Sequence, residues 1–177
     1  MNARIEKDFY FQTALHFAGE FWINSYEMTL SIIVETNCEV EQNVAIDRVS
    51  YYVKEVLQNC ILVDADDCES ITKYRNAGLR VCELPAEPYD HLFATVLLLK
   101  LNAIMEGKLR ITDMVLGSSM SEGVRYNIVS EVAESSYPKS TWWNKADTSI
   151  NNLALDSSNV VKLFDDNEWI SLDLGWK

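Results

Sequence analysis

One apolar stretch, between Pro88 and Gly107, constrains the fold of this chain more than any other feature. Its spacing predicts a helix over residues 89–106, because proline suits the first turn of a helix and glycine suits its end. Apolar residues cover most of its circumference: Leu92, Phe93, Val96, Leu97, Leu98, Leu99, Leu101, Ile104 and Met105. Such a helix is stable only when it is covered on several sides. We therefore expect it to lie between a sheet and either another helix or another subunit.

Two segments near the N-terminus alternate between apolar and polar residues, as strands with one buried face do. The first covers residues 9–17, and we expect residues 21–23 to continue it past a bulge or turn at Gly19. The second covers residues 26–35. Because the connection between them is short, the pattern predicts an antiparallel hairpin.

The remaining pattern predicts a second long helix, over residues 43–60, and two more strands, over residues 109–118 and 123–132. Between the helices lies a polar connection with a short helix over residues 67–77 and an extended segment over residues 79–84. The order ββααββ predicts an α+β fold: a four-stranded antiparallel sheet with two long helices on one face.

The sequence predicts a domain over residues 1–132, followed by an arm over residues 133–177 that is rich in aromatic residues. Four of the five tryptophans lie in this arm. So much aromatic area is atypical of a disordered segment. We expect the arm to pack on the domain or on a neighbouring subunit.

The charge of the chain excludes some classes of partner. Its 27 acidic and 15 basic residues give a net charge of −12, and no cluster of Lys and Arg is present. Both nucleic acid and anionic lipid are therefore unfavourable partners. The four cysteines form no CxxC pair and the N-terminus has no apolar run, so we expect reduced thiols and a cytoplasmic location.

Four segments resemble the tunnelling fold of the 6-pyruvoyl- and 6-carboxy-tetrahydropterin synthases. "FQTALHF" is similar to their first strand, which ends in a zinc-binding histidine, and "NSYEMTLSIIVE" is similar to their second. "ILVDADDCES" resembles the segment after their first helix, and "EPYDHLFATVLLLKL" resembles the start of their second helix. The resemblance spans residues 9–132. It implies a homo-oligomer in which subunits close a barrel and bind a purine- or pterin-like ligand at their junctions.

The resemblance does not extend to the catalytic residues. Zinc in that family requires three histidines, whereas only His16 occupies a ligand position here, and Asn24 and Tyr26 stand near the other two. No cysteine lies between His16 and Tyr26. At the position of the anchoring glutamate the chain has Gly117 or Ser118, with Glu122 several residues later. We therefore expect no zinc, no cofactor and no catalysis of that kind.

Other candidate sites have structural explanations. Isolated histidines such as His16 and His91 are mostly hydrogen-bonded structural residues, although their convergence with a cysteine or aspartate stays possible. The carboxylates of "DADD", at residues 64–67, suit a helix N-cap better than a calcium loop. The "GSSMSEG" loop, at residues 117–123, suits a hairpin better than a phosphate site.

The function that the sequence favours is a non-catalytic, homo-oligomeric binding protein. Its candidate ligand-binding residues are Gln12, His16, Arg110, Glu122 and Arg125. One alternative is an acidic inhibitor or adaptor, of the kind found among phage accessory proteins, that binds a basic partner protein. A second alternative is a divergent pterin or purine enzyme, for which stoichiometric zinc would be the evidence.

Overall fold

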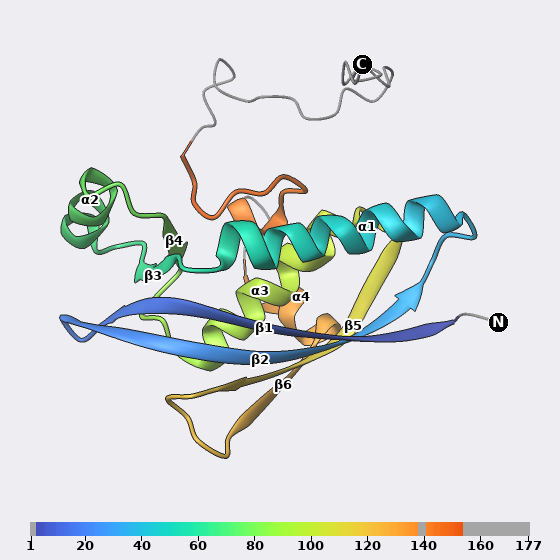
Figure 1. Cartoon of the computed structure of the whole chain (residues 1–177), viewed down its shortest axis with the longest axis horizontal. Coiled ribbons are helices and arrows are strands. Elements are labelled where there is room, and N and C mark those ends of the chain that lie inside the picture. The colour runs from blue at the N-terminus through green and yellow to red at the C-terminus, as the bar shows by residue number, and fades with distance from the viewer. Residues whose placement is uncertain (1–2, 138–140, 154–177) are drawn as a thin grey trace, which may run out of the picture.

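A six-stranded sheet in the order β4-β3-β1-β2-β5-β6 forms the centre of the protein (Figure 1). The computed structural model describes residues 3–137 and 141–153. In chain order, the elements are β1 (Arg4–Phe17), β2 (Glu20–Val34), α1 (Glu39–Tyr51), a π-helix (Tyr52–Leu57), β3 (Ile61–Asp64), α2 (Cys68–Asn76), β4 (Val81–Leu84), α3 (Asp90–Met105), β5 (Leu109–Ser118), β6 (Arg125–Val129), α4 (Ser130–Ser136) and a 3₁₀ turn (Trp142–Asn144).

The predicted hairpin is present, but its turn lies earlier in the chain than expected. β1 and β2 pair from Arg4 opposite Ile33 to Phe17 opposite Glu20, so residues 21–23 belong to the second strand and not to the first. The chain reverses at Ala18 and Gly19, whose φ angles are 51° and 79°. Positive φ at both positions is typical of the two-residue turns whose twist matches a hairpin.

The predicted four-stranded antiparallel sheet is wrong, because the sheet has six strands and two parallel pairings. The four expected strands do lie side by side and antiparallel, as β1-β2-β5-β6. Beyond β1, however, β3 and β4 extend the sheet in parallel. Both are short and buried on both faces, so they show no alternation of apolar and polar residues. The α+β class itself is confirmed.

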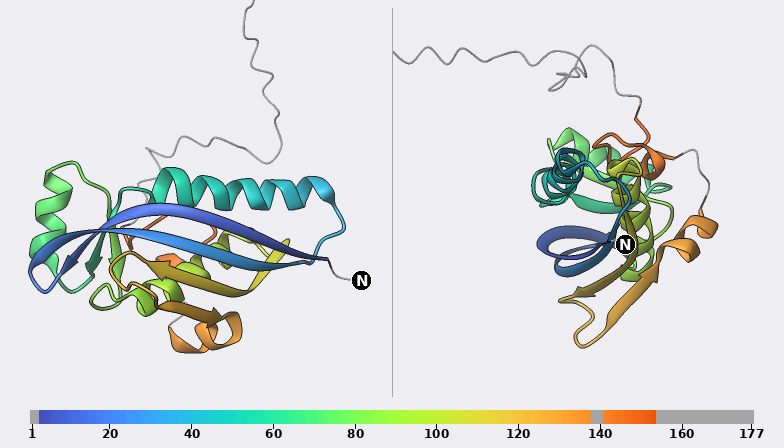
Figure 2. Two further views of the ribbon diagram at one scale, coloured as in Figure 1. Left: turned by 60° about the horizontal axis from the view of Figure 1, so that its bottom comes forward. Right: turned by 90° about the vertical axis from the view of Figure 1, so that its right-hand side faces the viewer.

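Helices α1 and α3 lie on the same side of the sheet (Figures 1 and 2). The main core contains inward residues of β1, β2 and β5 together with most of α3, including Leu30, Met114 and Leu98. The predicted helix over residues 89–106 is therefore confirmed, and Glu106 and Gly107 end it with φ angles of 48° and 72°. A second, smaller cluster places α2 against β3 and β4.

The last predicted strand is shorter than expected, since β6 ends at Val129 and α4 begins at the next residue. The expected domain boundary at residue 132 thus falls inside a helix. Of the expected arm, residues 141–153 lie on the domain, where Trp142, Trp143 and Ile150 join the main core. Residues 154–177 lie outside the described part of the chain.

A buried lysine on α3 holds this described part of the arm. The ammonium of Lys100 donates to the carbonyl oxygens of Trp142 (3.1 Å) and Lys145 (2.8 Å), to Asp147 Oδ1 (3.1 Å) and to Ser149 Oγ (3.3 Å). Its side chain is fully buried. The arm also covers the edge of β4, because the backbone N–H of Glu83 donates to the carbonyl of Ile150 (2.9 Å).

Replacing the buried lysine should destabilise the protein. Lys100→Met leaves two carbonyls and Asp147 without their charged donor, and a buried acceptor that loses its donor costs about 1–3 kcal/mol. Urea unfolding followed by tryptophan fluorescence would measure this loss. The matched control is Lys54→Met, at an exposed position of the π-helix. Equal stability of the two variants would contradict the assignment.

The stability difference between the wild-type protein and Lys100→Met should depend on pH. Burial lowers the pKa of Lys100 to about 8 in the folded protein, whereas the pKa of a lysine in an unfolded chain is about 10. Between these pH values the unfolded chain binds a proton that the folded chain does not, so the free energy of unfolding rises with pH. The stability deficit of Lys100→Met should therefore grow as the pH is raised from 8 to about 10. Burial also raises the pKa of the Cys82 thiol. Because both proteins contain Cys82, its contribution to the pH dependence largely cancels in this difference.

Candidate functional site

His16 lies beneath helix α2 and is held there by three side chains. Its Nδ1 is 2.7 Å from the hydroxyl of Tyr74. On the other side of the ring, Nε2 is 3.3 Å from Ser70 Oγ and 3.4 Å from Asp67 Oδ2. Asp67 also caps α2, since it accepts a hydrogen bond from the backbone N–H of Ser70 (3.0 Å). The predicted N-cap in "DADD" is therefore confirmed, and the histidine connects β1 to α2.

These contacts give His16 a structural role. His91 is on α3, where its ring contacts Tyr89 and Tyr126 and not the cluster around His16. Among residues 3–137 and 141–153, no three His, Cys, Asp or Glu side chains converge in a way that could hold a metal ion. All four cysteines are free thiols, with Cys60 and Cys82 buried and Cys38 and Cys68 exposed.

The loop between β5 and β6 is fixed by a polar network at the start of α3. Asp90 accepts hydrogen bonds from the hydroxyls of Tyr26 (3.2 Å), Ser118 (2.5 Å) and Ser121 (2.8 Å). The fully buried Asn24 accepts from Ser119 Oγ (2.9 Å). Burial and the neighbouring Asp90 raise the pKa of Tyr26 far above its usual value, so its phenol remains a donor. The hydroxyls of "GSSMSEG" thus bind the protein's own side chains.

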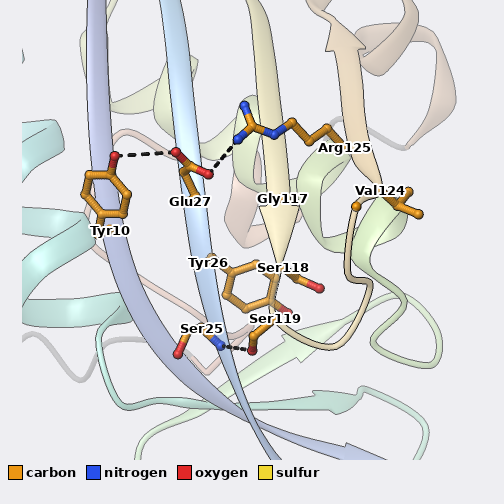
Figure 3. A pocket seen from close by; sticks show the side chains of 10 residues that line it. Tyr10, Ser25, Tyr26, Glu27, Gly117, Ser118, Ser119, Val124 and Arg125 are labelled. Atoms are coloured by element: carbon orange, nitrogen blue, oxygen red, sulfur yellow. Dashed lines mark hydrogen bonds and ion pairs between the residues drawn. The ribbon is translucent and has the colours of Figure 1, made fainter.

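A shallow depression of about 370 Å³ lies beside this loop, on the face of the sheet opposite α1 and α3 (Figure 3). It spans β1, β2, β5 and the start of β6. Its lining residues are Tyr10, Ser25, Tyr26, Glu27, Gly117, Ser118, Ser119, Gly123, Val124 and Arg125.

Across this depression runs one row of side chains, and a carboxylate lies at its centre. Register places Tyr10, Glu27, Gly117 and Arg125 on four adjacent strands. Glu27 accepts from the Tyr10 hydroxyl (3.4 Å) and from Arg125 Nη2 (2.9 Å), as Figure 3 shows. Gly117 lies beneath the Arg125 side chain, since a Cβ added to it would be in ordinary contact with Arg125 Cγ at 3.5 Å. Tyr10 is 72% exposed and offers an aromatic face.

The structure brings together only some of the predicted binding residues. Arg125 lines the depression, and Gln12 borders it through a hydrogen bond from its side-chain amide to Ser25 Oγ (3.5 Å). Glu122 is exposed in the adjoining loop, next to Gly123. His16 lies apart, under α2.

Arg110 is also distant from the depression. It is opposite Ile33, six residues along β2 from Glu27, which corresponds to about 20 Å at the rise of a strand. There it forms an ion pair with Glu35 (3.1 Å).

Sequence reasoning missed Tyr10 and Glu27, although a signal for this pair exists. A turn at Ala18 and Gly19 places residue 10 directly opposite residue 27. The predicted hairpin extended the first strand to residue 23. Its register therefore did not place Tyr10 opposite Glu27.

Taken together, these residues define an α+β protein with a mixed six-stranded sheet, helices α1 and α3 on one face, and a shallow polar depression on the other. None of the helices in the described part of the chain is both long and apolar enough to cross a lipid bilayer. No family model and no curated protein matches the sequence.

Among solved structures, this chain is similar to the crystal structure of the uncharacterized protein WS1659 from Wolinella succinogenes. The two share a TM-score of 0.55 at 10% sequence identity, over 73% of this chain and 98% of that one. At this identity the likeness concerns the fold alone.

Substitution of the two histidines tests whether the contacts of His16 hold α2 in place. His16→Ala removes three polar contacts, so α2 should loosen and the free energy of unfolding should fall by about 1–2 kcal/mol. Hydrogen exchange of the α2 amides would report the local effect. His91→Ala, at an exposed position, is the matched control and should leave α2 unchanged. Identical exchange in both variants would refute the structural role of His16.

Proposed function

We propose that this chain is a non-catalytic, homo-oligomeric binding protein whose open sheet face holds a small planar ligand of the purine or pterin class. The observation that carries the proposal is the depression in which Glu27 lies between Tyr10 and Arg125. The proposal includes a cytoplasmic location, which the four free thiols support.

The chemistry of the depression suits such a ligand. A carboxylate accepts two hydrogen bonds from adjacent N–H groups at the edge of a heterocycle, and charged acceptors form the stronger bonds. The exposed ring of Tyr10 offers a stacking surface, while Arg125 can pair with an anionic substituent of the ligand. Glu27 is already partly desolvated, at 45% side-chain exposure, and it is oriented by two donors. Little rearrangement is therefore needed on binding.

Uncovered strand edges support self-association. Within the described residues, β6 pairs with β5 alone, and residues 4–11 of β1 have no strand partner on the side of β3. The arm covers the opposite edge, at β4. Exposed edges favour pairing with another strand, and closing a ring of subunits removes them. Because Val124 and Arg125 lie at the β6 edge, a neighbouring subunit joined there would border the depression.

A distant relationship to the tunnelling-fold proteins remains part of the proposal. In its favour, β1-β2-β5-β6 are adjacent and antiparallel, with α1 and α3 on one face. In this view, β3, α2 and β4 are an addition beyond β1 that enlarges the sheet.

Ligand binding should depend on the central carboxylate. Pterin (2-amino-4-oxopteridine) and guanosine are suitable probes for titration calorimetry. Glu27→Gln should weaken binding of a probe about tenfold, because a charged acceptor is replaced by a neutral one. Glu6→Gln is the matched control: it is an exposed glutamate on the same face, opposite Ser31, four residues along β2 from Glu27.

The titrations also separate the competing explanations. Absence of binding by both probes, or equal losses in the two variants, would overturn the assignment of the depression. One zinc ion per chain in the purified protein would instead favour the enzyme alternative.

The assembly can be tested separately by light scattering at micromolar concentration. The wild-type protein should be an oligomer, and Val129→Lys should shift it toward monomer, since charge on an edge strand opposes pairing. Val129 is 43% exposed on β6, and Val132→Lys, on α4 at 63% exposure, is the control. A monomeric wild-type protein would contradict the proposed assembly.

A further inference from the structure

A continuous stripe of aromatic rings crosses the surface where α3 begins. The ring centroids of Phe17 and Tyr89 are 5.2 Å apart, those of Tyr89 and His91 are 5.9 Å apart, and those of His91 and Tyr126 are 6.1 Å apart. Trp22 lies on the same face of the hairpin, diagonally across from Phe17, and we group it with these four rings. We call these five residues the aromatic stripe.

Two rings of the stripe are large aromatic groups in contact with solvent. Tyr89 is 50% exposed and Trp22 is 44% exposed. Trp22 follows the turn of the β1–β2 hairpin by three residues, and Tyr89 immediately precedes α3 and contacts Phe17 beside that turn. The stripe is on the α3 side of the sheet, so it is separate from the depression that contains Glu27.

Acidic residues accompany the stripe. Its three chain segments, residues 17–22, 87–91 and 122–126, contain the carboxylates Glu20, Glu87 and Glu122 and a single basic residue, Arg125, while Asp90 is already bound by the hydroxyls of the loop between β5 and β6. The guanidinium of Arg125 pairs with Glu27 on the opposite face. Glu20 is directly opposite Phe17, and its side chain therefore projects on the stripe's side of the hairpin.

From this combination we infer that the aromatic stripe binds an arginine-bearing segment of a partner protein. A guanidinium stacks on the faces of Tyr and Trp rings and forms bidentate hydrogen bonds with carboxylates, so it uses both features of the surface at once. Lysine is a more strongly hydrated point charge and matches the ring faces less well.

Charge disfavours two other occupants. Single-stranded nucleic acid also stacks on aromatic rings, but its phosphates would meet a chain of net charge −12 and the carboxylates beside the stripe. A second copy of this chain that bound through the same surface would place its carboxylates close to those of the first copy, and their repulsion would weaken binding. A cationic segment gains from both the local and the overall charge.

The test uses a fluorescent peptide with arginines spaced by glycines and two analogues, in which every arginine is replaced by lysine or by neutral citrulline. Fluorescence anisotropy with the full chain should show binding of the arginine peptide, about tenfold weaker binding of each analogue, and weakening in high salt. Tyr89→Ala and Glu20→Gln should each reduce the affinity at least fivefold, or about 1 kcal/mol by the relation of affinity to free energy.

Tyr51→Ala is the matched control, because it removes a tyrosine of similar exposure (49%) at the end of α1, outside both the stripe and the depression. Circular dichroism confirms that each variant is folded. Unchanged affinity for Tyr51→Ala, with losses for Tyr89→Ala and Glu20→Gln, supports the inference. Three results would overturn it: equal binding of the arginine and lysine peptides, equal losses for both tyrosine variants, or loss of self-association in Tyr89→Ala, which would make the stripe an interface between copies.

Discussion

The need to cover α3 on several sides at once determines the rest of this structure. Eleven of its sixteen residues are buried, and one of them is Lys100. The sheet covers one side of the helix, α1 lies beside it, and residues 141–150 of the arm cover the remaining side and supply acceptors for the ammonium. A charge in such a position is costly unless it is fully paired. The arm therefore completes both the apolar and the polar requirements of the same helix.

Long periodic elements could be predicted from the sequence, and short buried elements could not. The helix over residues 89–106 and the strand over residues 109–118 match α3 and β5 closely, because several turns or alternations repeat the signal. By contrast, β3 is an apolar run of four residues without alternation, and periodicity alone does not distinguish such a run from a buried helical segment. A bulge or turn at Gly19 was expected, but residues 21–23 were assigned to the first strand, because the apolar residues on both sides of Gly19 continue the strand pattern.

The candidate site shows the same limit at the level of side chains. Gln12 and Arg125 could be chosen from the outward positions of predicted strands, and both lie at or beside the depression. Glu27 could not, because its importance comes from pairing across the sheet with residues 10 and 125, which requires the register. His16 was named as a candidate ligand-binding residue, but its side chain contacts Tyr74 and Ser70 of α2, more than fifty residues later in the chain, and such long-range partners cannot be identified from the strand pattern.

The contacts of the arm couple two requirements of the folded state. Residues 141–150 follow all six strands and α3 in the chain, and they supply all four acceptors of the Lys100 ammonium. The same residues supply the backbone partner of Glu83 at the edge of β4. Undocking of this segment would therefore return one ammonium to water and open one strand edge together.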